Sequence, residues 1–270
     1  MQQQLVKQLV INPWIPFRTL VIREIKRFMK VVIQTVISPI ISSSLYLLIF
    51  GVSLGSQVNL KNGLPYISFL IPGLMVMGLI NNSFQNSSSS IVTSKFSGDL
   101  EDLRVAPISN NQIIWAMGVG GIIRGTSVAL ISGLVGMVFH YFMLGTFLQI
   151  EHPLLFIIFL ALGGLIFSFC GIFVAFLAKT FDQLSAFSTF ILIPLTYLGG
   201  VFMSISSLSP FWQKVCHLNP VFYLINGFRY SVLGVSDVEI IPTLVVCFIA
   251  LLVTYLIALY SLARGSFSRW

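Results

Sequence analysis

Long apolar runs separated by short polar segments make up most of this chain. A helix that crosses a bilayer needs roughly 20 apolar residues, and six runs reach about that length: 31–55, 66–89, 113–141, 154–178, 184–203 and 241–263. The apolar positions within them do not alternate as in a barrel strand, and lipid tolerates only helices or closed barrels. The pattern therefore predicts six transmembrane helices in an all-α integral membrane protein.

The composition supports the same class. Hydrophobic residues make up 56% of the chain and charged residues 9%, whereas about 25% of residues are charged in an average soluble domain. The mean hydropathy is +0.95. We expect residues 1–270 to form a single transmembrane domain with a six-helix core over residues 31–263.

The distribution of Lys and Arg predicts the orientation, because cytoplasmic loops carry an excess of both. With an even number of spans, the chain ends share one side of the membrane, and eleven cations fall there: Lys7, Arg18, Arg23, Lys26, Arg27, Lys30, Lys95, Arg104, Lys179, Arg264 and Arg269. Three fall on the other side, Lys61, Lys214 and Arg229. Both termini are therefore predicted to be cytoplasmic. This bias and anionic lipid headgroups account for the net charge of +7 without a nucleic-acid partner.

A basic amphipathic helix is predicted over residues 13–30, before the first span. Phe17, Val21, Ile25 and Phe28 recur at helical spacing, and the cations lie on another face. Such a helix lies on the inner leaflet. It is interpreted either as a simple anchor or as a rigid element that connects the first span to a cytoplasmic partner.

The end of the second span is too polar to face lipid. Asn82, Asn86 and Ser89 repeat at helical spacing, and Gln85 lies among them. These four side chains are candidates for lining an aqueous path, and the alternative is that they hold helices together by hydrogen bonds.

An acidic segment separates the second and third spans. Three of the chain's eight carboxylates, Asp99, Glu101 and Asp102, lie within it. Acids in a first helical turn, Ser97 as a cap and Pro107 as a stop predict a short helix. A solvated charge cluster is the default interpretation, but the flanking hydrophobic residues, Leu100, Leu103 and Val105, favour a surface for a partner.

Residues 204–239 fall outside the membrane by the predicted topology, yet they are rich in aromatic residues and Leu. The pieces 208–218 and 221–233 are too short to cross a bilayer, and apolar pieces of about 10 to 14 residues are typical of re-entrant or interfacial helices. We expect them to form a lid at the outer face.

Catalytic and ion-coupling signals are weak. No Asp or Glu falls within the six spans, which disfavours ion-driven transport. Arg124 lies in the third span, where it either extends to the interface or marks a functional contact. The sequence has no P-loop motif, and its three histidines lack metal-ligand spacing. The GxxxG motif at Gly121 and Gly125 predicts close helix packing.

Together these features resemble the membrane subunits of type-2 ATP-binding-cassette exporters. The resemblance covers nearly the whole chain and is most specific at two segments. One is LEDLRVAPIS, which supplies Leu100, Glu101, Leu103 and Pro107. The other is NPVFYLINGFRYSVLG, in which the family positions are Asn219, Pro220, Tyr223, Gly227 and Arg229.

The resemblance implies that two copies of the chain pair in a bacterial inner membrane, or that one copy pairs with a related chain, above two separate ATPase subunits. Those subunits, not this chain, would bind ATP and Mg²⁺. It also implies three groups of site residues: an ATPase-coupling helix with Asp99, Leu100, Glu101, Asp102, Leu103, Arg104 and Pro107; a connecting helix with Arg18, Arg23, Lys26 and Arg27; and an outer gate with Asn219, Pro220, Tyr223 and Arg229.

The implied function is outward transport of a lipid-like, glycan or hydrophobic drug-like molecule. Two other classes stay open at this point. The polar face of the second span also fits a self-sufficient channel or carrier, and scattered Ser and His residues also fit an intramembrane lipid-modifying enzyme.

Overall fold

The computed structural model describes residues 14–53, 55 and 63–264, with the side chains of Arg104 and Val105 excepted. The described chain is helical, with no strand in these ranges. Its helices are α2 (Trp14–Met29), α3 (Val32–Tyr46), α4 (Tyr66–Ser97), α5 (Asp99–Val105), α6 (Asn110–Leu144), α7 (Pro153–Leu177), α8 (Phe181–Phe187), α9 (Ile193–Leu198), α10 (Pro210–His217), α11 (Pro220–Leu233) and α12 (Ile240–Arg264). Two π-helical turns, Leu47–Ser53 and Ser188–Leu192, continue α3 and join α8 to α9.

Five helical segments are long and apolar enough to cross a membrane: Val32–Ser53, α4, α6, α7 and α12. Each matches one of the six predicted spans, although α4 continues past the predicted end at residue 89 to Ser97, and α6 begins at Asn110, before the predicted start at residue 113. The predicted fifth span is helical from Phe181 to Leu198. It begins with polar residues and is not among the five, so the number six stays a prediction.

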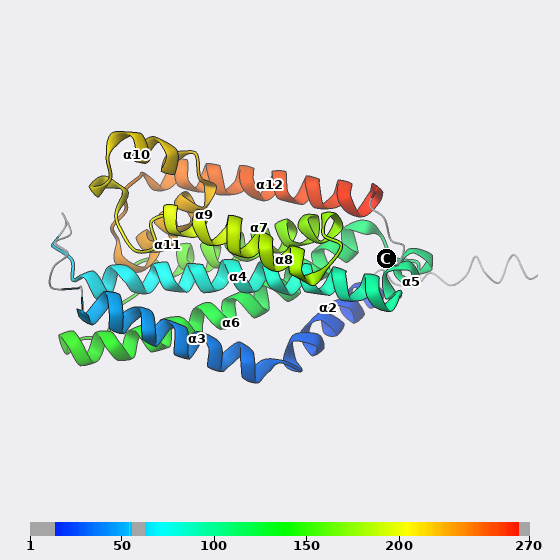
Figure 1. The fold of residues 1–270 in the computed structure, drawn as a ribbon, viewed down its shortest axis with the longest axis horizontal. Helices are drawn as coiled ribbons and strands as arrows, with labels where there is room; N and C mark the ends of the chain where they lie inside the picture. The colour runs from blue at the N-terminus through cyan, green and yellow to red at the C-terminus, as the bar shows by residue number, and fades with distance from the viewer. Residues whose placement is uncertain (1–13, 54, 56–62, 265–270) are drawn as a thin grey trace, which may run out of the picture.

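The long helices lie roughly side by side in an elongated bundle (Figure 1). Helix α4 runs through its centre and packs against α6, α7 and α11. The two ends of the bundle differ: α5 lies at one end, and α10 and α11 lie at the other (Figure 1). We call these the α5 end and the α11 end.

Small residues allow α4 and α6 to approach closely. Ser83 Oγ donates a hydrogen bond to the carbonyl of Gly121 at 3.1 Å. A Cβ atom added at Gly125 would collide with Ser83 Oγ and lie 2.9 Å from the carbonyl oxygen of Leu79. The prediction of close packing at this GxxxG motif is therefore confirmed.

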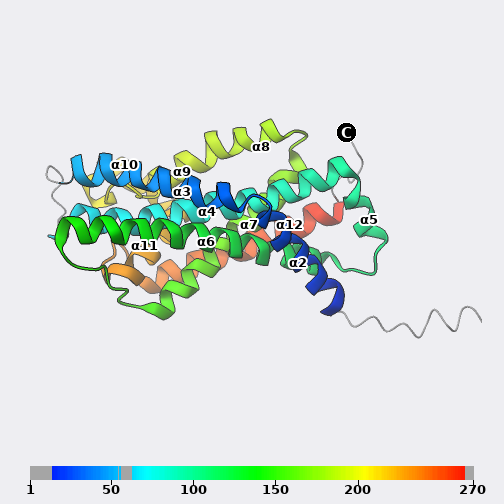
Figure 2. The ribbon, with the colours of Figure 1, turned by 90° about the horizontal axis from the view of Figure 1, so that it is seen from below.

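Helix α2 crosses the bundle at an angle, near the α5 end (Figure 2). It packs on α6, and its buried residues are Leu20, Glu24 and Phe28. The predicted apolar face, which contained Phe28 but not Glu24, was therefore only partly right. Serines on α4 and a glycine on α6 leave space for a carboxylate, so a charged residue lies within the contact.

The α5 end is held together by a lysine predicted to lie in a loop. Lys95 belongs to α4 and is 0% exposed. Its Nζ atom donates to the carbonyls of Ala175 at 2.9 Å and Phe176 at 3.5 Å, at the end of α7. Because these carbonyls end a helix, they lack intrahelical partners and suit a cation. Lys95 therefore joins the ends of α4 and α7.

The predicted outer helices are present with nearly the expected bounds. Helix α11 is buried along most of its length and packs against α4, α7 and α12. Helix α10 lies at the surface, with Phe211 and Trp212 exposed. The structure thus packs one of the two pieces into the bundle and leaves the other outside it.

Candidate functional site

One face of the bundle, formed by α3, α4 and the segment α8–α9, is polar. These three segments lie next to one another on the side that faces the reader in Figure 1. On α3, Gln34, Ser38 and Ser42 are exposed and recur every fourth residue. On α4, Gln85 is exposed and Asn81, Asn82 and Ser89 are half-buried; Ser185 and Thr189 are exposed opposite them. We call this surface the polar face.

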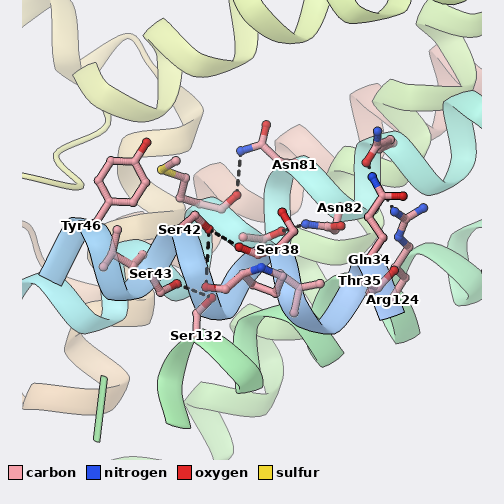
Figure 3. A pocket seen from close by; sticks show the side chains of 16 residues that line it. Gln34, Thr35, Ser38, Ser42, Ser43, Tyr46, Asn81, Asn82, Arg124 and Ser132 are labelled. Carbon is pink, nitrogen blue, oxygen red and sulfur yellow. Dashed lines mark hydrogen bonds between the residues drawn. The ribbon is translucent and has the colours of Figure 1, made fainter. Parts of the chain in front are cut away.

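A first cavity of about 190 Å³ lies between α3, α4 and α6 (Figure 3). Its wall contains mainly hydroxyl and amide side chains. They are Gln34, Thr35, Ser38, Ser42, Ser43, Tyr46, Asn81, Asn82, Gln85 and Ser132, together with Arg124. Figure 3 shows Arg124, Gln34 and Thr35 at one end of the cavity and Tyr46 at the other.

A second cavity, of about 280 Å³, lies on the other side of α4. Its polar lining comprises Asn81, Gln85, Ser88, Ser89, Ser185, Ser188 and Thr189. Gln85 and Asn81 border both cavities. The polar residues of α4 therefore form a ridge between two hollows.

The structure separates the four predicted path residues. Asn82, Gln85 and Ser89 border the cavities, but Asn86 does not. Asn86 is 0% exposed, and neither amide atom has a hydrogen-bond partner among the described residues. It faces α6, where its Nδ2 would lie 3.3 Å from a Cβ atom at Gly120. Helical spacing alone could not distinguish Asn86 from the cavity-lining residues, because a residue four positions after Asn82 can also face α6.

Arg124 borders the first cavity, and it does not extend to the surface. Its side chain lies in the bundle, with the residue 8% exposed. Nη2 donates to Gln85 Oε1 at 3.4 Å, and Nε has no partner. Of the two interpretations of this residue, the structure supports a contact in the interior.

The carboxylate of Glu24 is the centre of a polar cluster between α2 and α4. Glu24 is 1% exposed and forms ion pairs with Arg27 at 3.1 Å and Arg23 at 3.5 Å. Ser90 Oγ donates to it at 2.8 Å. Arg27 also donates to Ser89 Oγ at 3.0 Å and to the Asn86 carbonyl at 2.5 Å. The sequence analysis missed Glu24, although a single acid among the cations of α2 was a usable signal.

Of the predicted connecting-helix residues, Arg23 and Arg27 are therefore brought together by Glu24. Arg18 and Lys26 are both exposed on the same helix. Neither takes part in the contacts with Glu24.

The acidic segment forms α5 as predicted, but its two sides have different roles. Asp99, Glu101, Asp102 and Pro107 are exposed, whereas Leu100 and Leu103 are buried in the hydrophobic core. The two leucines anchor α5 to the bundle, so its exposed side is formed by the acids, and the role of the leucines in ATPase coupling stays a prediction. The helix begins after Gly98, whose φ of 85° breaks the chain direction, and Ser97 is the last residue of α4. The side chain of Arg104 lies outside the described residues.

Asn219 and Arg229, two of the four predicted outer-gate residues, bind main-chain groups. Asn219 caps α11, and its Nδ2 donates to the carbonyl of Leu195 on α9 at 2.7 Å. Arg229 is buried; it donates to the Gly200 carbonyl at 2.6 Å, and its guanidinium lies 3.7 Å from the ring centre of Phe69 on α4. Pro220 is exposed and Tyr223 packs on Phe222. Two of the four residues thus attach α11 to the end of α9.

Comparison with known proteins adds to this geometry. The sequence model described as "ABC-2 type transporter" matches residues 16–233. The chain belongs to the ABC-2 type transporter family. The match extends from α2 to the end of α11 and so covers the polar face, α5 and the α11 end.

Named relatives agree with the family. This ABC-2 chain is 38% identical to the inner membrane transport permease YadH of Escherichia coli K12 over 93% of its own length and 96% of the relative's. It is 24% identical to nodulation protein J of Sinorhizobium fredii over 68% of each chain. The ABC-2 protein is thus a membrane transport permease, and its apolar helices fit a multi-pass protein of the inner membrane. Among the described residues, no cluster of three metal-ligating side chains is present.

Proposed function

We propose that the chain is the membrane subunit of an ATP-driven exporter and moves a lipid-like, glycan or hydrophobic drug-like substrate outward. Two copies would combine with two ATPase subunits, which would bind ATP and Mg²⁺. The observation that carries the proposal is the polar face with its two cavities, in a chain of the ABC-2 family.

A second copy is proposed to cover the polar face. Polar side chains are costly in lipid and normally face another helix or a water-filled space. The opposite situation holds on α12, where only apolar side chains such as Phe248 and Leu252 are exposed along the middle of the helix. We therefore propose that α12 faces the lipid and that the polar face contacts the partner copy. The transport path would run between the polar faces of the two copies.

Helix α5 is proposed to dock on the ATPase through its exposed acids. Its buried leucines and the Lys95 contact would transmit movement to α4 and α7. The Glu24 cluster would make α2 move with α4, which favours the rigid connecting element over the simple anchor for α2. At the other end, Asn219 and Arg229 would make α11 follow α9 and so open or close the exit.

The test is purification of the full chain from its native cells in mild detergent, followed by identification of stoichiometric partners. We expect a P-loop ATPase, whose hydrolysis in the reconstituted complex depends on this chain. Candidate substrates from the lipid-like, glycan and hydrophobic drug-like classes would then be screened by their stimulation of ATP hydrolysis.

A chain that purifies alone and moves solute in vesicles without ATP would contradict the proposal and favour a channel or carrier. A chain that alone releases a chemically altered lipid would favour the enzyme alternative. Both outcomes are measured on the same preparation.

A further inference from the structure

The first cavity is bordered by the guanidinium of Arg124, whose hydrogen-bond donors are only partly paired within the protein. Arg124 is the only ionisable side chain apart from Tyr46 among the residues that line it, and no carboxylate is in that lining. The Nε atom has no partner, and the single hydrogen bond to Gln85 is 3.4 Å long. A buried charge whose hydrogen bonds are incomplete is costly, and an oxyanion in the cavity would supply the acceptors that Arg124 lacks.

Nearby carboxylates do not supply that anion. The ion pairs found in the described chain all involve Glu24, which binds Arg23 and Arg27. Arg27 acts on Arg124 as a second positive charge, although its ion pair with Glu24 offsets part of that charge. The local field there favours a negatively charged ligand.

Several of the hydroxyl and amide side chains in the cavity wall, unlike Arg124, already donate hydrogen bonds within the protein. Thr35 and Ser42 donate their hydroxyl protons to carbonyls of their own helix, and Ser43 donates to Ser132 at 3.0 Å. Asn81 and Asn82 each donate one amide proton to α4 itself. These groups still offer oxygen atoms and further amide protons to a ligand, but their own bonds do not require one.

Cavity size and surroundings restrict the ligand further. A cavity of about 190 Å³ is below the roughly 300–1,000 Å³ typical of sites for whole small molecules. On α3, apolar side chains are exposed beside the polar stripe, among them Ile37 and Ile41. The cavity therefore suits a headgroup, and the neighbouring surface suits an apolar tail.

We infer that Arg124 binds an oxyanion, a phosphate or carboxylate group, on the substrate that this permease moves. Within the proposed function, on which this inference rests, it selects anionic amphiphiles and disfavours neutral or cationic ones. Gln85 positions the guanidinium from α4, and the amides and hydroxyls of α3 and α4 bind the remaining polar atoms of the headgroup.

The experiment measures binding to the purified full chain in neutral maltoside detergent by titration calorimetry. Dihexanoyl phosphatidylglycerol and dihexanoylglycerol are the probes, since they share their tails and only the first carries a phosphate oxyanion. We expect the anionic probe to bind about 10-fold more tightly, which corresponds to about 1.4 kcal/mol. Equal affinities for the two probes in the wild-type chain would overturn the inference without any mutation.

Variants locate the site. Arg124→Gln should remove most of the preference, Arg124→Lys should retain part of it, and Lys214→Gln on exposed α10 should retain all of it, although it removes the same charge. Monodispersity and the unfolding temperature are checked for each variant. A properly folded Arg124→Gln chain that keeps the full preference would assign anion binding elsewhere and refute the site.

Inorganic phosphate distinguishes the source of the oxyanion. If phosphate alone displaces phosphatidylglycerol from the wild type but does not bind Arg124→Gln, the site takes free oxyanions as well as lipid headgroups. If phosphate does not compete, the lipid tail is required for binding. Both results support an oxyanion at Arg124 and assign its source.

This test is independent of the ATPase. If the chain shows the anion preference but no ATPase co-purifies, the proposed function fails and the binding site stands. If the ATPase co-purifies and the preference is absent, only the present inference fails.

Discussion

At the residue scale, the buried charges of this protein are neutralised or hydrogen-bonded in different ways. Lys95 and Arg229 donate to main-chain carbonyls at helix ends, Glu24 pairs with arginines, and Arg124 has only a long bond to Gln85. Carbonyls beyond a helix end suit a cation because they have lost their intrahelical donors. Arg124 differs from the others because no carboxylate or main-chain carbonyl in the described chain accepts a hydrogen bond from its guanidinium.

Glu24→Ala should destabilise the protein by about 2 kcal/mol, because Arg27 loses its carboxylate and Ser90 its acceptor. The double variant Glu24→Ala with Arg27→Ala should lose less than the sum of the two single variants, since it leaves no half of the ion pair behind. Denaturant unfolding in detergent measures all three chains. Strict additivity would show that the two side chains act independently.

The sequence analysis found the polar residues of α4 but not which of them face a cavity. Asn82 and Asn86 are equivalent by helical spacing, yet one lines a cavity and the other faces Gly120, because the neighbouring helix decides which side is filled. Lys95 was assigned to a loop for a related reason. Hydropathy ends the span near Ser89, whereas packing against α7 extends the helix to Ser97.

At the element scale, the acidic helix α5 has a buried apolar face and an exposed acidic face. Leu100 and Leu103 hold α5 in place, and the acids point outward. The sequence predicted this helix and its length well, because dipole and stop signals are local. It could not predict the inward leucines, because burial depends on where α5 packs.

Charge reversal of Asp99, Glu101 and Asp102 to Lys should abolish co-purification of the ATPase while the chain still inserts in the membrane. The reason is that these exposed side chains contribute to docking and little to folding. Reversal of the exposed acids Glu151 and Glu239 serves as the control and should keep the partner. An intact complex after the triple reversal would remove α5 from the docking surface.

The contact between α4 and α6 offers a matched pair of glycine substitutions. Gly125→Ala should destabilise the protein by about 1–3 kcal/mol, because the added methyl meets the main chain of Leu79 in a packed interior. Gly133→Ala should be nearly neutral, since its methyl meets only the flexible end of Met75. Unfolding temperatures compare the two, and equal losses would contradict close packing as the cause.

At the scale of the whole molecule, the bundle has an apolar side formed by α12 and a polar side formed by α3, α4 and α8. The hydrophobic pattern predicted the long helices, because each span is encoded within its own residues. The polar side arises only when three separate segments meet, so its full extent could not be predicted. The serines of α3 in particular are too few to change the hydropathy of their span.

Cross-linking tests the assignment of these two sides. In a chain whose cysteines Cys170, Cys216 and Cys247 are replaced by Ser, Ser42→Cys should form a bismaleimide cross-link between two copies in native membranes. Leu252→Cys on the apolar side of α12 should not. The reverse pattern would place the second copy against α12.

Accessibility to a membrane-impermeant maleimide tests the predicted orientation in the same background. Lys214→Cys on α10 should react in intact cells, whereas Asp102→Cys on α5 should react only after the membrane is permeabilised. Labelling of Asp102→Cys in intact cells would invert the topology.

Helix α4 also has a mechanical consequence. Its 32 residues form one continuous rod of roughly 48 Å, fixed to α7 by Lys95 two residues from its end. Near the other end, Tyr66 donates a hydrogen bond to the Phe202 carbonyl at 2.7 Å, and Phe69 stacks on Arg229. A rod held close to one end acts as a lever, so a small tilt imposed at α5 becomes a displacement many times larger beside the outer helices. In the proposed function, the exit would then follow the ATPase without a relay through intermediate segments.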